Sequence, residues 1–329
     1  MNCINTDYFK PFLQAFCEKT QPLYTCGYPW GPFVPYTMPR YNDADVKIFY
    51  MGRDTYYWVE QEELFEAFTN HVLEDYLGKN AACVDVEKML GWKNNAGSFW
   101  TMVAKLHLLI RTGRYTEDIM QISAADKVIL EEIGYGNINA IEQQTSLSKE
   151  GYWEAITSLD GYCQIREAGR PFEKLKSVIE AYHPDFIFIF NWEERDDVFE
   201  GMDFEWQKVY YKDKLQAVYT LPGYSTKVIW TSHPRRYSYL GTNIEEMAGS
   251  LADTFALTKI VWMESKSFSD IVGTVFSNSM FLQLVLLMSE KDDADKGFGR
   301  YSLVWEAKCW NVTSASTQKS FIRNRSGIE

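Results

Sequence analysis

Residues 185–190 read DFIFIF and run directly into Asn191, and this stretch decides the fold class. A strand with an unbroken apolar run has no polar face, so both of its faces must be covered, as they are in parallel sheets. Residues 47–51 (KIFYM) follow the same pattern, and residues 216–220 (QAVYT) and 227–230 (KVIW) are shorter strand candidates. The sequence therefore predicts a sheet that is buried between two layers of helices.

Helical patterns alternate with these strands. In residues 60–77, Leu64, Phe65 and Phe68 begin an apolar stripe at helical spacing, and glutamates occupy the first turn. Helices are also expected at residues 8–18, 97–111, 243–262 and 268–289, with two more within 149–182. Strands that alternate with helices predict an α/β fold with three layers (α/β/α) and a central, mostly parallel sheet.

The chain shows no internal repeat and no low-complexity linker, so its division rests on composition. Residues 22–42 hold five of the ten prolines, which predicts a helix and a proline-rich arm over residues 1–44. Residues 45–245 are expected to form the α/β core, with an insertion around 59–135. Residues 246–329 are expected to form a helical extension that packs on the core.

The net charge of −12 argues against a general nucleic-acid-binding surface, but its distribution is uneven. Residues 214–244 and 307–327 contain no Asp or Glu and carry several Lys and Arg side chains. Such segments are compatible with one restricted phosphate-binding face, and for residues 307–327 taken alone chance clustering on a solvated surface is an equal alternative.

The six cysteines form no C-x-x-C pair, so the sequence predicts neither a zinc knuckle nor an iron–sulfur cluster. The first ten residues lack the features of a signal peptide, and the longest apolar run, residues 284–288, is too short to cross a bilayer. We therefore expect a soluble cytoplasmic protein that uses no metal and no cofactor and does not contact a membrane.

Polar residues follow three of the predicted strands. Asp54 comes shortly after the first strand, Asn191 directly after DFIFIF, and His233 shortly after KVIW. Ligands of open α/β sheets bind beyond the carboxyl ends of the strands, so these side chains are expected to share one site. A carboxamide can read the edge of a base, an imidazole can donate to a developing oxyanion, and a carboxylate can stabilise a cationic sugar.

This arrangement resembles the uracil-DNA glycosylase superfamily. Residues 52–57 (GRDTYY) occupy the register of its first motif, G-Q-D-P-Y-H, and the apolar strand that ends in Asn191 matches its middle motif. Residues 233–238 (HPRRYS) match its last motif, H-P-S-P-L-S, and residues 137–142 (NINAIE) are loosely similar to the start of its "NIYKEL" helix. The resemblance covers roughly residues 45–245 and implies the fold of that superfamily.

The resemblance also implies a role for each matching residue. Asp54 would orient the attacking water or stabilise the sugar cation, and His233 would donate to the base as its bond to the sugar breaks. The base would be bound by Asn191, Tyr56, Gly52 and Arg53. DNA would be bound by Arg235, Arg236, Tyr237 and Ser238, with Tyr237 as the side chain that enters the duplex while the base is flipped out.

Two substrates remain open. The position of Tyr56 favours uracil, because a tyrosine there excludes groups on C5 of the base. Thr55 and Tyr57 depart from the motif, as do the residues after Pro234, and these departures favour a remodelled pocket. We therefore expect a monofunctional DNA glycosylase that acts on double-stranded DNA. Its expected substrate is a bulky modified cytosine, such as glucosylated hydroxymethylcytosine of phage DNA, in antiviral defence.

The alternatives are a uracil-DNA glycosylase of base-excision repair and a non-catalytic module that binds DNA or nucleotides. An unrelated α/β hydrolase is disfavoured, because the chain has neither a G-x-S-x-G elbow nor a Walker-type glycine loop.

Overall fold

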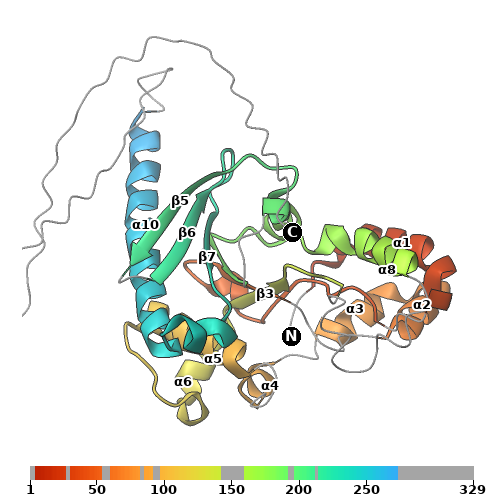
Figure 1. Cartoon of the computed structure of the whole chain (residues 1–329), viewed down its shortest axis with the longest axis horizontal. Helices are drawn as coiled ribbons and strands as arrows, with labels where there is room; N and C mark the ends of the chain where they lie inside the picture. Colours follow the sequence, from red (N-terminus) through yellow and green to blue (C-terminus); the bar gives the residue numbers. More distant parts are fainter. Residues whose placement is uncertain are drawn as a thin grey trace, which may run out of the picture. The chain divides into compact units, whose positions relative to one another are not determined.

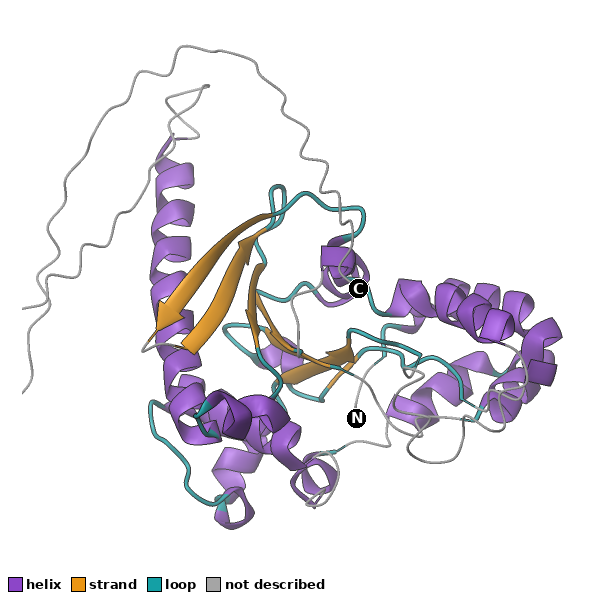
Figure 2. Cartoon of the chain, in the orientation of Figure 1, coloured by secondary structure: helices purple, strands orange, loops and turns teal. Residues whose placement is uncertain are grey.

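A seven-stranded sheet forms the centre of the computed structural model (Figures 1 and 2). The structure describes residues 4–26, 30–53, 60–81, 85–91, 97–141, 159–191, 196–211 and 214–272. The chain divides into two units, Met1–Phe276 and Ser277–Glu329, and all described residues belong to the first.

The sheet is mixed and mostly parallel. Its order is β1-β3-β2-β4-β7-β6-β5, and the neighbours β3, β2, β4 and β7 pair in parallel. The pairs β1–β3, β7–β6 and β6–β5 are antiparallel. The strands are β1 (Tyr36–Thr37), β2 (Ile48–Gly52), β3 (Ile133–Asn137), β4 (Phe186–Phe190), β5 (Glu205–Tyr211), β6 (Lys214–Thr220) and β7 (Lys227–Thr231).

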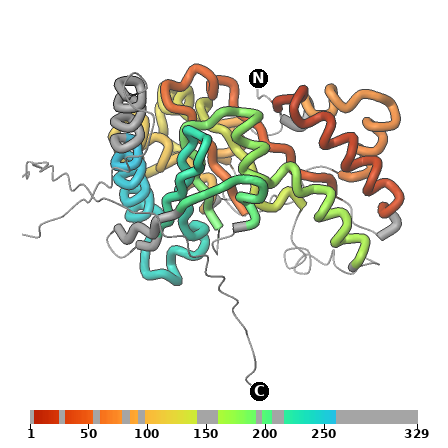
Figure 3. Tube along the Cα trace, turned by 90° about the horizontal axis from the view of Figure 1, so that it is seen from above, coloured from red at the N-terminus to blue at the C-terminus, as the bar shows by residue number. Residues whose placement is uncertain are grey.

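Helices cover both faces of the sheet, as the apolar strands require. One face packs against α1 (Thr6–Thr20), α2 (Gln61–Thr69), α3 (Leu73–Ala81), α8 (Leu159–Gly169) and α9 (Leu175–Tyr182). The other packs against α4 (Val86–Gly91), α5 (Gly97–Thr112), α6 (Ala124–Leu130) and α10 (Ile244–Val272). In both Figure 1 and the perpendicular view of Figure 3, α1 and α8 lie side by side on the far side of the sheet from α10.

Alternate residues of the central strands β2 and β4 enter different cores. In β4, Ile187 and Ile189 join one cluster, whereas Phe186, Phe188 and Phe190 join the other. All five β4 positions are buried, which explains why the sequence of this strand has no polar face. The predicted α/β class is thereby confirmed.

The prediction of one continuous helix over residues 60–77 is wrong, because two helices, α2 and α3, form in this segment. His71 has a left-handed backbone (φ 59°). His71 N donates to Phe68 O (3.2 Å) and Val72 N donates to Ala67 O (2.9 Å), which is the bond pattern of a Schellman helix end. The sequence did not signal this end, since glycine usually occupies the left-handed position.

Three strands were not predicted, and one of them, β1, has only two residues. β5 lies at the edge of the sheet, and β3 contains Gly134 and Gly136, which have low strand propensity. A Cβ atom on Gly134 would lie 2.1 Å from the ring of Phe49, so the glycine is required by the neighbouring side chain. Packing across the sheet, rather than local propensity, makes residues 133–137 a strand.

The segment expected to be an insertion connects β2 to its parallel neighbour β3. Within it, α5 buries Met102, Val103 and Leu106 completely against the sheet, so part of this segment is a crossover of the core. The predicted C-terminal extension begins with α10, whose residues Met247 and Leu251 belong to the same cluster. Of the helix expected at 268–289, residues beyond 272 lie outside the described residues.

Within the described part of the chain, no helix is both long enough and apolar enough to cross a membrane.

We expect Gly134→Ala to lower the free energy of unfolding by about 1–3 kcal/mol, because the new methyl group overlaps the ring of Phe49. Gly78→Ala is the matched control. Nothing lies within 4 Å of a Cβ at this position in α3, so the change should stabilise the protein by about 0.5–1 kcal/mol. Urea unfolding of the two variants measures both effects. Equal stabilities would contradict the packing of β3 against Phe49.

Candidate functional site

The strand order brings the predicted strand ends together along the carboxyl-terminal edge of the sheet, where the parallel strands end. β2, β4 and β7 are consecutive neighbours and parallel, so their carboxyl ends lie side by side. The carboxyl end of β3 adjoins that of β2, with Gly52 opposite Asn137. This edge is where ligands of open α/β sheets bind.

Asn191 and His233 are held to each other through the backbone. Asn191 N donates to Thr231 O (3.1 Å), and His233 N donates to Asn191 O (3.1 Å). These bonds extend the β4–β7 ladder beyond the last paired residues, Phe190 and Thr231. The sheet therefore fixes the backbone positions of the two residues that carry the predicted amide and imidazole groups.

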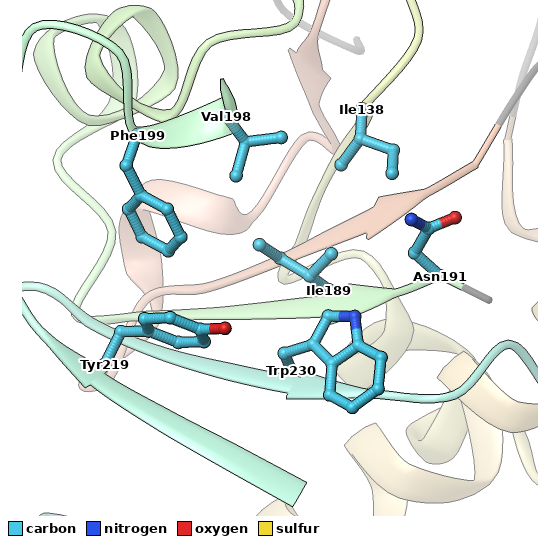
Figure 4. A pocket seen from close by; sticks show the side chains of 7 residues that line it. All are labelled: Ile138, Ile189, Asn191, Val198, Phe199, Tyr219 and Trp230. Atoms are coloured by element: carbon cyan, nitrogen blue, oxygen red, sulfur yellow. The ribbon is translucent and has the colours of Figure 1, made fainter. Parts of the chain in front are cut away.

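The amide side chain of Asn191 lines a small cavity on the face of the sheet that carries α8 and α9. Asn191 is 6% exposed. The cavity is otherwise enclosed by apolar and aromatic side chains from five other elements or loops (Figure 4). These are Ile138, Ile189, Val198, Phe199, Tyr219 and Trp230.

The buried imidazole of His233 accepts a hydrogen bond in this structure. Arg235 N donates to His233 Nδ1 (3.2 Å), so Nδ1 is an acceptor and the ring proton of the neutral imidazole lies on Nε2. Burial, with smaller contributions from the charges of Arg235 and Arg53, lowers the pKa of His233 to about 4. The ring of Phe99 stacks on the imidazole, with centroids 6.4 Å apart and an angle of 19° between the planes.

Gly52 and Arg53 connect the first predicted motif to the loop after β3. Gly52 O accepts from Ile138 N (2.9 Å), and Arg53 O accepts from both the backbone N (3.1 Å) and Nδ2 (3.0 Å) of Asn139. A Cβ at position 52 would lie 2.9 Å from Oδ1 of Asn137, so only glycine fits without a shift. The structure thus brings Gly52 and Arg53 to the same edge as Asn191 and His233.

Asn137 and Asn139 are residues at this edge that sequence reasoning did not assign. Residues 137–142 were expected to begin a helix, but Asn137 is the last residue of β3 and residues 138–141 are not helical. Tyr135 donates through its hydroxyl to Asn137 Oδ1 (2.9 Å), and Arg166 Nη2 donates to Asn139 Oδ1 (3.4 Å). The sequence could have indicated Asn137, because it ends a segment of apolar residues as Asn191 does. The two glycines of that segment have low strand propensity, so it was not recognised as a strand.

Asp54 and Tyr56 lie outside the described residues, because the description of this loop ends at Arg53 and resumes at Glu60. The predicted catalytic carboxylate and the predicted C5 contact therefore remain predictions.

The placement of Tyr237 corrects one expectation. Its side chain is 2% exposed and belongs to the core cluster with α5 and α10, so it cannot enter DNA from this position. Burial raises the pKa of its hydroxyl. Tyr237 lies in the 3₁₀ helix η8 (Pro234–Leu240), in which residues two positions apart point in different directions. Tyr239 is accordingly 87% exposed, and Leu240 is 48% exposed.

The remaining predicted DNA contacts lie on the same short helix. Arg235 and Ser238 are exposed and Arg236 is partly exposed. Beside them lies a groove of about 420 Å³. It is lined by Lys105, Tyr115, Pro234, Tyr237, Ser238, Thr242, Asn243, Ile244 and Glu245. Lys105 Nζ donates to Tyr115 Oη (2.8 Å) and Glu117 O (2.6 Å), so internal acceptors already hold its ammonium group.

No group of three or more His, Cys, Asp or Glu side chains that could hold a metal ion occurs among the residues that the structure describes.

Comparison with known proteins adds no identity, since no family model, curated protein or solved structure matches this chain.

The tautomer and pKa of His233 can be measured directly. We expect ¹⁵N NMR of labelled protein to show an unprotonated Nδ1 and a protonated Nε2 at neutral pH, with a titration midpoint near pH 4. Since the folded-state pKa is lowered, His233 contributes stability above the ordinary histidine pKa of about 6.5 that is lost as the pH falls toward 4. A midpoint near 6.5, or a proton on Nδ1, would rule out this arrangement.

Proposed function

We propose that this protein is a DNA glycosylase with the fold of the uracil-DNA glycosylase superfamily. It flips a non-standard pyrimidine out of double-stranded DNA and hydrolyses the bond between the base and the sugar. The observation that carries the proposal is the backbone link from Thr231 through Asn191 to His233, which joins a residue with an amide and a residue with a neutral imidazole at the carboxyl ends of β4 and β7.

Each described residue has a chemical task in this reaction. The amide of Asn191 pairs with the edge of the flipped base, because it offers both a donor and an acceptor. Nε2–H of His233 donates to the carbonyl oxygen of the base, on which negative charge builds as the bond breaks. A neutral imidazole serves this purpose at physiological pH without first losing a proton.

The reaction needs only water as co-reactant. The C1′–N1 bond breaks and its electron pair leaves with the base, while the water oxygen bonds to C1′ and the displaced proton ends on the base. Asp54 is proposed to orient that water or to stabilise the sugar cation. The products are a free base and an abasic site, and the scheme requires no metal and no cofactor.

For the substrate we propose a modified cytosine, as in phage DNA, with uracil as the alternative. Support comes from the departures from the family pattern at Thr55, Tyr57 and the residues after Pro234. An enzyme of this kind would act in antiviral defence, whereas removal of uracil would place it in base-excision repair.

DNA would reach the site across η8. Arg235 and Arg236 are proposed to contact phosphates that flank the flipped nucleotide. An exposed aromatic ring can stack on a base without first giving up packing contacts within the protein. Tyr239 is the exposed ring on this helix. We therefore assign the stacking role to Tyr239 and a core role to Tyr237.

The decisive experiment is a strand-nicking assay after heating in alkali, which breaks DNA at abasic sites. The substrates are normal DNA, uracil-containing DNA, and phage DNA with hydroxymethylated or glucosylated cytosine. We expect breaks on one modified DNA, loss of breaks with Asp54→Asn, and a rate about 10²- to 10³-fold lower with His233→Phe, which keeps a ring but removes the donor.

His183→Asn is the matched control for the histidine. His183 also precedes a proline, but it caps α9 at the opposite edge of the sheet, and its backbone is left-handed (φ 48°), which asparagine tolerates. Its activity should equal that of the wild type. If the protein binds DNA but produces no breaks on any substrate, the glycosylase proposal is wrong and the non-catalytic binding module is favoured.

Tyr239→Ala should weaken DNA binding on the order of tenfold without changing the urea midpoint, because the ring is exposed and stacks only on DNA. Tyr237→Ala should instead lower the urea midpoint, because the ring fills the core. Fluorescence anisotropy with a labelled duplex and urea unfolding measure the two effects. Unchanged binding by Tyr239→Ala would remove this residue from the interface.

A further inference from the structure

The cavity beside Asn191 has a size that limits what it can hold. Its free volume of about 10 Å³ accommodates roughly one atom of the size of a water oxygen. It lies at the carboxyl ends of β4 and β7, and the turn η7 (Asp196–Phe199) closes it with Val198 and Phe199. Lys174 holds this turn in place through a bond from its ammonium group to Asp197 O (2.7 Å).

Trp230 brings a hydrogen-bond donor to this cavity. The indole is 5% exposed, and its Nε1–H finds no acceptor among the residues that the structure describes. Figure 4 shows the indole nitrogen on the edge of the ring that faces Ile189 and Asn191. Buried donors are nearly always paired, so this N–H points to an acceptor that the described residues do not supply.

The lining favours an oxygen that belongs to a larger ligand over an isolated water. A buried water typically makes about three hydrogen bonds, whereas most of the lining is hydrocarbon or aromatic ring. An oxygen that is covalently tied to a ligand needs fewer partners, because the rest of the ligand holds it in place. The amide of Asn191, on the same cavity wall, is the group that would hold that rest.

We propose that this cavity is the deep end of the base pocket and that Trp230 determines specificity by donating to an oxygen on a small substituent of the base. The inference rests on the proposed function and narrows its substrate. A hydroxymethyl group on cytosine supplies one oxygen of the required size. A glucosyl group is far larger than the cavity, so a glucosylated base would have to direct its sugar elsewhere.

The test uses free bases and needs no catalysis. In protein with ¹⁵N-labelled indoles, the cross-peak lost in Trp230→Phe identifies Trp230, and contacts of its indole proton with Ile189 methyl groups confirm this in the wild type. We expect 5-hydroxymethylcytosine to move that peak downfield, while cytosine and 5-methylcytosine leave it in place. 5-Methylcytosine is the matched probe, because its methyl group fills space but accepts no hydrogen bond.

Trp230→Phe keeps an aromatic ring and removes the donor. It should weaken binding of 5-hydroxymethylcytosine about tenfold and leave binding of cytosine unchanged, as expected for one lost hydrogen bond. Trp30→Phe, a change in a partly buried indole that does not line the cavity, should leave both affinities unchanged. If Trp230→Phe does not fold, the wild-type titration alone decides the matter.

A peak that no base moves, or that 5-methylcytosine moves as far as 5-hydroxymethylcytosine, overturns the inference. These results are separate from those of the nicking assay. A response of Trp230 without abasic sites would support the base pocket and refute the proposed hydrolysis. Abasic sites with an unresponsive Trp230 would support the glycosylase and refute the role of this indole.

Discussion

The parallel pairing of β4 with β7 is the constraint on which the site depends. It sets Phe190 opposite Thr231, and the ladder then continues through Asn191 to His233 by two backbone bonds of 3.1 Å. Backbone bonds of this kind position two side chains more rigidly than contacts between mobile loops, because the sheet on both sides resists any shift of register. The backbones of two residues that lie 42 positions apart in sequence are thereby linked directly.

The two-sided burial of the central strands supplies the rigidity behind this pair. Every residue of β2, β3 and β4 is buried, and the alternating side chains of β2 and β4 enter two separate cores. A slip of one residue would exchange the sets that face these cores and would move Gly134 away from the ring of Phe49, which only a glycine can accommodate. The register of the strands, and with it the position of the site, is therefore strongly specified.

The chemistry of the site follows from its position at the end of this buried sheet. His233 is enclosed by Phe99 and close to Arg53 and Arg235, so its imidazole stays neutral, and the bond from Arg235 N leaves the proton on Nε2. The 3₁₀ helix η8, which begins directly after His233, turns Tyr237 into the core and Tyr239 outward. One short 3₁₀ helix thus anchors the site with one buried tyrosine and leaves a second exposed.

The sequence by itself determined the α/β class and the positions of β4, β7 and most of β2, because unbroken apolar runs can be satisfied only by strands covered on both faces. It also determined that Asn191 and His233 follow strands, since these residues stand next to the runs in the chain.

Only the tertiary structure decided which strands are neighbours, that residues 133–137 are a strand, and that Tyr237 is buried while Tyr239 is not. Each of these depends on contacts between residues far apart in sequence. Phe49 packs over Gly134, and α5 and α10 pack around Tyr237. Local patterns record the periodicity of one segment, whereas such contacts depend on the segment that packs against it.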